Sequence, residues 1–288
     1  MMMRWDWRKL MMSILKKILS VFFCKEGQFA AGGLFSAGHF ILLATTIFFI
    51  YKALNKTLQY SFQKIRGIIK KLVITMTIFE LAKIAFHFIQ GDMNELKDWV
   101  PLYFCSIFLY AGWLSVFAKG FLRHAGDVFL ASGSLIGGIC FLLYPSSSLL
   151  LYPSFHFLCF HSFLYHGVMV YIGVLMNRSG LVNLKKEDMH LYFWFTSLIC
   201  ILAWIINLRY GTNFMFISDT FHGTLLDIPY RVLGPFYTPV LILVQAIVPF
   251  RVIQWFRHHT SLLTRPAWYP DTCCDVVNNG KIRKEYKY

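Results

Sequence analysis

The fold of this chain is decided by residues 72–90, which read LVITMTIFELAKIAFHFIQ. The stretch is long enough to cross the hydrocarbon core of a bilayer, for which a helix needs about 20 predominantly apolar residues. Only Glu80 and Lys83 carry a formal charge within it. Because backbone groups at that depth have no water to bind, the stretch predicts a transmembrane helix.

The composition of the whole chain agrees with this reading. Its 288 residues are 57% hydrophobic, 18% aromatic and only 15% charged, and the mean hydropathy is +0.54. A soluble domain is about 45–50% apolar and about 25% charged. The deficit of charge argues against a soluble enzyme, a disordered chain and a disulfide-rich secreted domain. We therefore expect an all-α fold, a polytopic transmembrane helix bundle.

Seven apolar stretches of this kind follow one another along the chain. They cover roughly residues 33–51, 72–90, 99–118, 126–144, 154–176, 190–208 and 232–253. Between and after them, 18 of the 28 lysines and arginines fall in the first, third and fifth connections and in the C-terminal tail. By the positive-inside rule these segments face the cytoplasm. Seven spans then place the N-terminus outside, although six further basic residues precede the first span.

The N-terminal segment has its own periodicity. Leu10, Ile14 and Ile18 recur at helical spacing, and Lys16 and Lys17 fall on the other face. This pattern predicts an amphipathic helix in the membrane interface. A signal peptide is the alternative, but the two lysines interrupt any apolar core.

The chain therefore divides into three expected parts. Residues 1–28 form a basic amphipathic interfacial segment, residues 29–258 the transmembrane bundle, and residues 259–288 a cytoplasmic tail. The net charge of +14 indicates membrane orientation and contact with anionic lipids through the N-terminal helix and the loops. Nucleic acid is not an expected partner, because no soluble basic domain is present to bind it.

Ionisable groups inside a membrane span are costly and are candidates for function. Glu80, Lys83 and His87 are three and four residues apart, so they share one stripe of a helix. Two interpretations remain open: a structural ion pair between helices, and the polar wall of a cavity.

The third and fifth spans carry further reactive side chains. Cys105 lies near the start of the third span, where a lone Cys is most often a small hydrophobe. His156, His161 and His166 follow one another at steps of five, so consecutive rings point to different helix faces and a metal site is not expected. A single His facing the interior is a candidate acid or base. His166 is favoured because Gly167 leaves room beside it.

Residues 207–240 are too polar for a span and too apolar for a plain loop. We expect a re-entrant or interfacial segment, with a structured outer loop as the alternative. Asn207, Asn213 and Asp227 are expected to hydrogen-bond backbone groups there.

Six short motifs in this order resemble the YwaF-like integral membrane family. They are FELAKIAFHFIQGD (79–92), PLYFCS (101–106), SFLYHG (162–167), TNFMF (212–216), LLD (225–227) and GPFY (234–237). Tyr103 and Phe236 replace a His and a Trp of the family pattern. The resemblance implies a helical protein of the bacterial plasma membrane. Animal relatives of the family include a Cys-dependent phospholipid acyltransferase.

The resemblance further implies that Cys105 is the acyl-accepting nucleophile and His166 the essential base. Glu80, Lys83 and Asn213 would support them by fixing the imidazole or by holding the oxyanion. Membrane phospholipids would be the substrates, and neither a cofactor nor a metal is expected. The alternatives are a transporter, with Glu80, Lys83 and His87 along its path, and a seven-helix receptor or scaffold.

Overall fold

The computed structural model describes residues 7–91, 96, 99–220 and 226–264. Every regular element in these ranges is a helix. Six helices are long and apolar enough to cross a membrane, and a shorter apolar helix, Phe104–Phe117, accompanies them. The expected all-α bundle with about seven spans is therefore confirmed.

The elements alternate between long helices and short 3-10 or π turns. In chain order they are α1 (Trp7–Phe22), α2 (Ala37–Thr57), α3 (Phe62–Gln90), η2 (Phe104–Ser106), α4 (Ile107–Phe117), α5 (Gly120–Phe129), η3 (Leu130–Ser134), α6 (Leu135–Leu143), α7 (Ser146–Leu149), α8 (Phe157–Ser179), α9 (Asp188–Tyr210), η4 (Phe214–Phe216), α10 (Asp227–Leu233), η5 (Gly234–Phe236) and α11 (Tyr237–His259). A π turn, η3, joins α5 and α6 into one span.

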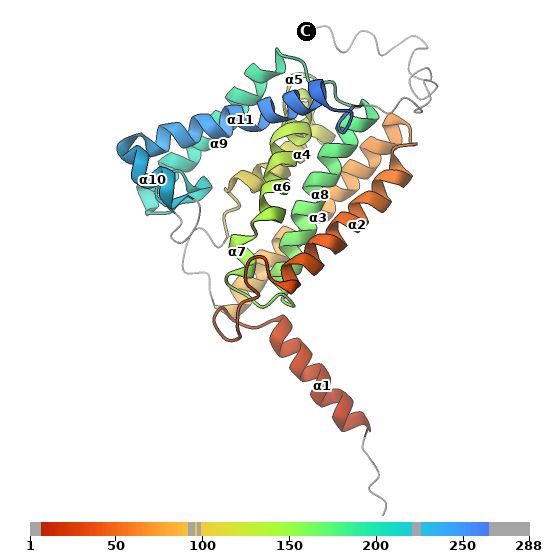
Figure 1. Cartoon of the computed structure of the whole chain (residues 1–288), viewed down its shortest axis with the longest axis vertical. Coiled ribbons are helices and arrows are strands. Elements are labelled where there is room, and N and C mark those ends of the chain that lie inside the picture. The colour runs from red at the N-terminus through yellow and green to blue at the C-terminus, as the bar shows by residue number, and fades with distance from the viewer. Residues whose placement is uncertain (1–6, 92–95, 97–98, 221–225, 265–288) are drawn as a thin grey trace, which may run out of the picture.

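Two spans form the centre of the bundle. The spans Gly120–Leu143 and Phe157–Ser179 are each 72% buried, against 33% or less for the others. Helix α8 packs against α2, α3 and α6 (Figure 1). Gly138 permits a close approach of α6 to α8, because a Cβ atom there would lie 2.9 Å from the carbonyl oxygen of His166.

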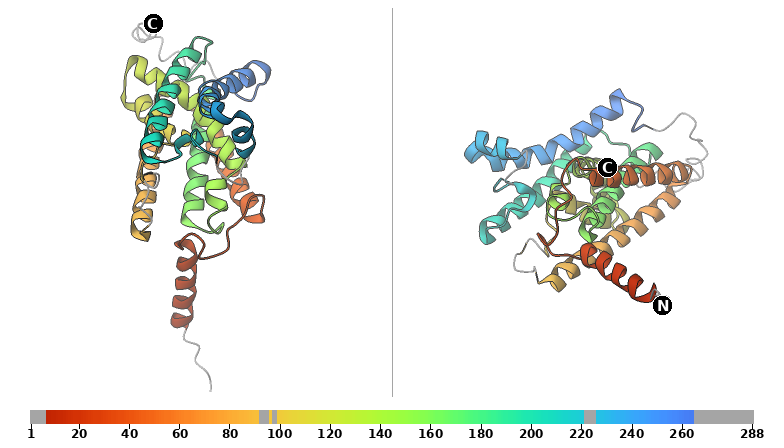
Figure 2. Two further views of the ribbon diagram at one scale, coloured as in Figure 1. Left: turned by 90° about the vertical axis from the view of Figure 1, so that its left-hand side faces the viewer. Right: turned by 60° about the horizontal axis from the view of Figure 1, so that its bottom comes forward.

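Helix α1 and the last turn of α11 lie at opposite ends of the molecule (Figure 1). The connection before α2 lies at the end of the bundle opposite the basic loops. Gly32 and Gly33 there donate backbone hydrogen bonds of 2.9 and 2.8 Å to the carbonyls of Tyr152 and Leu149, in the connection between α6 and α8. Helix α1 projects from this end, away from the bundle (Figures 1 and 2). This placement agrees with an odd number of crossings between α2 and α11.

Helix α1 lies where the sequence predicts it, and none of its residues is buried. That exposure suits an interfacial helix, but its position in a membrane stays a prediction. The tail expected over residues 259–288 falls outside the described residues beyond residue 264.

Two spans begin earlier than predicted, at Phe62 and Gly120 instead of about residues 72 and 126. Three others begin four or five residues later than predicted. The third helix begins at Phe104 instead of residue 99, because Pro101 has no N–H and disfavours helical backbone before it. The first begins at Ala37, since Ser36 caps it through the N–H of His39 at 3.2 Å. The last begins at Tyr237, because Gly234 takes a positive φ of 50° and separates it from α10.

The polar segment between α9 and α11 is folded inward. Phe214 and Ile217 are fully buried. Asn207 donates to the carbonyl of Phe214 at 3.0 Å and accepts its N–H at 2.7 Å. Asn213 accepts the N–H groups of Ser218 and Asp219, each at 3.1 Å. The expected backbone hydrogen bonds are therefore confirmed for Asn207 and Asn213.

Candidate functional site

A buried polar cluster lies between α3 and α8. Glu80 is only 6% exposed and pairs with Lys83 on the same helix. This ion pair lies within one helix and not between helices, as one of the two interpretations had it. From α8, the Nε2 atom of His161 lies 3.6 Å from Oε2 of Glu80. Because an unpaired charge at such depth is costly, the carboxylate needs both neighbours.

Aromatic contacts continue this cluster along α8 to Cys105. The rings of His161 and Tyr165, one helical turn apart, stack with centroids 5.8 Å apart. The Tyr165 hydroxyl donates to the backbone carbonyl of Cys105 at 3.3 Å. Phe108, one turn after Cys105, meets the Tyr165 ring edge to face at 5.4 Å. A continuous line of side chains therefore runs from Glu80 to the turn that carries Cys105.

The turn that carries Cys105 is held from three sides. Cys105 is half-buried in η2, directly before α4. Phe104 packs against the backbone at Gly137, where a Cβ atom would approach its ring to 3.2 Å. Tyr103 contacts the rings of Phe214 and Phe216 at 5.5 and 5.3 Å. The inward-folded η4 segment thus fixes the entry to α4.

The η4 corner has an unusual backbone. Met215 and Phe216 have positive φ values of 58° and 55°, a conformation that L-residues adopt only where the surroundings enforce it. Gln245 of α11 donates to the Met215 carbonyl at 3.1 Å, and the Tyr237 hydroxyl donates to that of Phe216 at 2.8 Å. Helix α11 therefore holds the corner that contacts Tyr103.

His166 faces a different neighbour from His161. Its ring stacks on Phe141 of α6 with centroids 3.6 Å apart, and its Nδ1 lies 2.7 Å from the carbonyl of Ser162. Since a carbonyl only accepts, Nδ1 carries the proton and Nε2 keeps a free lone pair. That Nε2 atom is buried and has no hydrogen-bond partner in the part of the chain that the structure describes.

The candidate residues are thus only partly brought together. Glu80 and Lys83 join one cluster that reaches the backbone of Cys105, while His166 shares α8 with it but forms no hydrogen bond to Cys105 among the described residues. Asn213 lies elsewhere: its amide donates to the carbonyl of Asp219 at 2.8 Å within its own loop.

Sequence reasoning missed Tyr165 and named His161 only as one of three histidines in its span. Their spacing of four places them on one face of α8, and the charge of Glu80 called for a partner from another helix. Neither signal says which of the three histidines faces α3. The predicted divergence of these rings is confirmed, because His156 instead lies 3.1 Å from the carbonyl of Cys24.

The fold and this site define a multi-pass helical membrane protein with a polar cluster inside its bundle. The profile of the TMEM164 family matches residues 34–263. The chain therefore belongs to the TMEM164 family. Comparisons with curated proteins and with solved structures found no match.

The family match runs from before α2 to after α11, so it includes the Glu80 cluster, Cys105 and His166 but leaves α1 outside. The match supports the statement, implied by the resemblance, that the chain is an integral membrane protein. The YwaF-like relationship and the acyltransferase relatives stay predictions.

Proposed function

We propose that this protein is a membrane-embedded acyltransferase or lipid hydrolase that uses Cys105 as its nucleophile and a membrane phospholipid as the acyl donor. The observation that carries the proposal is the connected line from the buried Glu80 pair through Tyr165 to the Cys105 turn. A Cys that is only a packing residue does not require a buried carboxylate, with its desolvation cost, one helix away.

The short helix after Cys105 adds support. Residues 104–117 form an apolar helix below 18 residues in length, about 21 Å at 1.5 Å per residue, against a hydrocarbon core of about 30 Å. If the Phe117 end of this helix lies at the membrane interface on the side of the basic loops, the Cys105 end lies within the hydrocarbon core, below the opposite interface. The ester carbonyls of phospholipids lie just under the headgroups, within reach of a thiol so placed.

The proposed chemistry has two balanced steps. The Cys105 thiol gives its proton to a His, and the thiolate attacks the ester carbonyl of the donor lipid. The carbon–oxygen bond breaks, and the lysolipid oxygen takes that proton. The thioester then accepts a hydroxyl group, from a second lipid or from water, whose proton passes to the His and then to the released thiolate.

We assign the base to His166, as the resemblance implies; its Nε2 atom, like that of His161, has no hydrogen-bond partner among the described residues. Glu80 and Lys83 are proposed to support the site, with Lys83 as a donor to the developing oxyanion. Asn213 is proposed to act at a distance, by holding the loop behind η4 and hence the contact with Tyr103.

Transfer of a labelled acyl chain to the protein tests the proposal. The full chain in lipid nanodiscs would be incubated with a phospholipid that carries a radiolabelled acyl chain, and hydroxylamine-sensitive label on the protein would be measured. We expect label on the wild type and none on Cys105→Ala. Cys140→Ala is the matched control, because Cys140 is an exposed Cys on α6. Label that persists in Cys105→Ala would refute the nucleophile.

The same assay tests the base. His166→Gln should slow labelling by about 100-fold or more, the usual contribution of general base catalysis. If His161→Gln abolishes labelling while His166→Gln leaves it unchanged, the base is His161 and our assignment of His166 is wrong.

A transporter is the second candidate function, and the buried ionisable line of Glu80, Lys83 and His161 is the observation that favours it. In that case Glu80→Gln combined with Lys83→Met should stop uptake of solute or protons into proteoliposomes, and Cys105→Ala should not. Unchanged uptake in the double variant would exclude this path.

We also propose the orientation in the membrane. The basic connections and the C-terminus would face the cytoplasm of a bacterial plasma membrane, and the basic residues of α1 and the loops would contact anionic lipids.

A further inference from the structure

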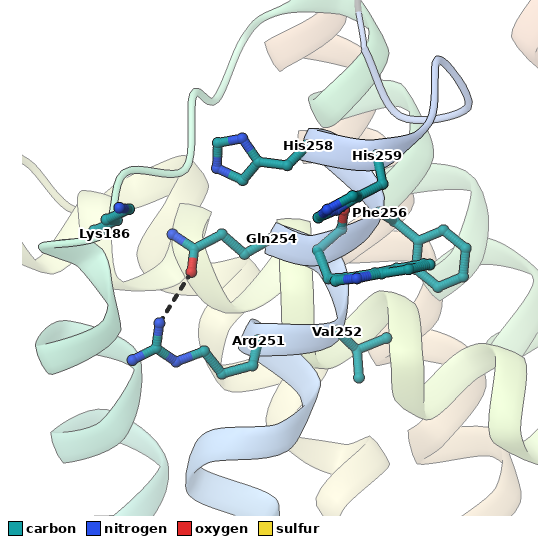
Figure 3. A pocket seen from close by; sticks show the side chains of 8 residues that line it. Lys186, Arg251, Val252, Gln254, Phe256, His258 and His259 are labelled. Atoms are coloured by element: carbon teal, nitrogen blue, oxygen red, sulfur yellow. Dashed lines mark hydrogen bonds between the residues drawn. The ribbon is translucent and has the colours of Figure 1, made fainter.

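A second feature of the molecule is a pocket at its basic end, far along the chain from Cys105. It has a volume of about 650 Å³ and lies between the last two turns of α11 and the α8–α9 connection (Figure 3). The side chains of Arg251, Gln254 and His258 extend from α11 toward Lys186, on the opposite wall (Figure 3).

The lining of this pocket has only one sign of charge. Lys186, Arg251 and two His residues line it, and no acidic residue does. Neither Lys186 nor Arg251 forms an ion pair within the described residues. The neighbouring carboxylate of Asp188 is occupied by His124, at 2.7 Å, and by the N–H of Lys185, also at 2.7 Å. The accessible lining is otherwise mainly apolar, and the Arg251 guanidinium donates to Oε1 of Gln254 at 3.4 Å (Figure 3). The two cationic side chains therefore favour an anion at this apolar pocket.

The walls of the pocket are fixed by Arg257. Its guanidinium donates to Oδ1 of Asn177 and Oδ1 of Asn183, each at 2.8 Å, and to the carbonyl of Val182 at 3.2 Å. These contacts tie α11 to the end of α8 and to the connection that leads to Lys186. The two cationic walls are thus held apart before any ligand binds, which lowers the cost of binding.

The exposed face of α11 continues from the pocket into the apolar part of the bundle. Val244, Val248, Arg251, Trp255 and His258 lie within about 40° of one direction on the helix, at 100° per residue. The two valines are 42% and 44% exposed, and Trp255 is 55% exposed. The stripe is apolar over its first turns, and Arg251, Trp255 and His258 follow over its last ones; Trp and basic residues are common at membrane interfaces.

From this two-part surface we infer that the pocket binds the phosphate headgroup of an anionic phospholipid, with the acyl chains along Val244 and Val248. Arg251 and Lys186 face the phosphate, and Trp255, one turn beyond Arg251, lies at the level of the headgroup. Basic pockets between spans bind headgroups of this class in the positive leaflet. The inference is independent of the Cys105 chemistry.

Native mass spectrometry of the full chain in detergent tests the site, with phosphatidylglycerol as the anionic probe and phosphatidylcholine as the zwitterionic one. We expect wild type to retain one phosphatidylglycerol at least about tenfold more tightly than phosphatidylcholine, and Lys186→Gln with Arg251→Gln to lose that preference. Lys52→Gln with Lys56→Gln is the matched control, because it removes the same charge from two exposed residues of α2, at the same end. The conservative pair Lys186→Arg with Arg251→Lys should retain binding.

Three results would overturn the inference. The first is equal binding of both lipids by wild type. The second is an equal loss of affinity in the control pair and the pocket pair, which would mean that surface charge alone attracts the lipid. The third is displacement of phosphatidylglycerol from wild type by millimolar inorganic phosphate, which would make free phosphate the ligand.

Discussion

Tyr165 is the residue that connects the buried cluster to Cys105, and removal of its hydroxyl group tests that connection. Tyr165→Phe removes the hydroxyl that donates to the Cys105 carbonyl at 3.3 Å. We expect a loss of stability of about 1 kcal/mol, the usual net value of one hydrogen bond, and slower acyl labelling of Cys105. Melting temperature and labelling rate measure the two effects.

Tyr171→Phe is the matched control for this prediction. Tyr171 also lies on α8, and its hydroxyl donates to Thr57 at 2.9 Å. Its loss should cost a similar amount of stability without slowing the labelling. Equal labelling rates in the two variants would mean that Tyr165 does not position the Cys105 turn.

His156 gives the molecule a dependence on pH. It lies just before α8, accepts the N–H of Leu158 on Nδ1 at 3.1 Å, and is fully buried. Burial lowers the pKa of His156 below its usual value of about 6.5. The neutral ring therefore contributes its full stability above about pH 6.5, and this contribution is lost as the pH falls through the lowered pKa.

We therefore expect the melting temperature of wild type to fall more steeply below about pH 6.5 than that of His156→Phe. Phenylalanine keeps a ring on Tyr152, which stacks on His156 at 4.3 Å, but cannot take up a proton. The difference between the two pH curves isolates His156 from the other histidines. Parallel curves would show that its protonation does not affect folding.

At the scale of the elements, charge pairing joins three helices at the basic end. Arg66 of α3 donates two hydrogen bonds of 2.7 and 2.6 Å to Asp127 of α5, and the Ser115 hydroxyl of α4 donates a third, of 2.6 Å, to the same carboxylate. Asp127→Ala should lower the unfolding free energy by about 3–5 kcal/mol, because it breaks the ion pair with Arg66 and removes the acceptor of the Ser115 hydroxyl.

Arg66→Met combined with Asp127→Leu should recover most of that loss, since an apolar pair of similar volume replaces a buried ion pair at little cost. Thermal unfolding of the three proteins in detergent measures both effects. If the double variant is no more stable than Asp127→Ala, the loss comes from packing around Asp127 and not from the broken ion pair.

Element boundaries show what sequence alone could and could not provide. The existence of each long helix follows from apolar runs that only a helix can carry through a membrane. The start of α4 depended on Pro101, and that of α11 on Gly234, whose φ is 50°. Both residues are visible in the sequence, but which turn of the chain they break depends on packing at that point.

At the scale of the whole molecule, the candidate site was predicted in its parts but not in its arrangement. The spacing of Glu80 and Lys83 specified their pair, because both lie on one helix. The contact of Glu80 with His161 and that of Tyr103 with the η4 corner cross between helices. Such contacts depend on the rotation of each helix about its axis. A helix that is apolar on all sides has no polar face, so its sequence does not show which side faces its neighbours.

That rotation is set by close packing at small residues. Alanine substitutions at two glycines distinguish the effect of packing from the effect of helix propensity. A Cβ atom on Gly126 of α5 would lie 2.4 Å from the carbonyl oxygen of Ala111 and 2.7 Å from the nitrogen of Ser115, both backbone atoms of α4. Gly67, within α3, has nothing within 4 Å of that position. Gly126→Ala should therefore lower stability by about 1–3 kcal/mol, as overpacking does, and Gly67→Ala should raise it by up to about 1 kcal/mol, because alanine favours helix. Melting temperatures in detergent measure both changes. A stabilising Gly126→Ala would mean that α4 and α5 do not pack backbone to backbone.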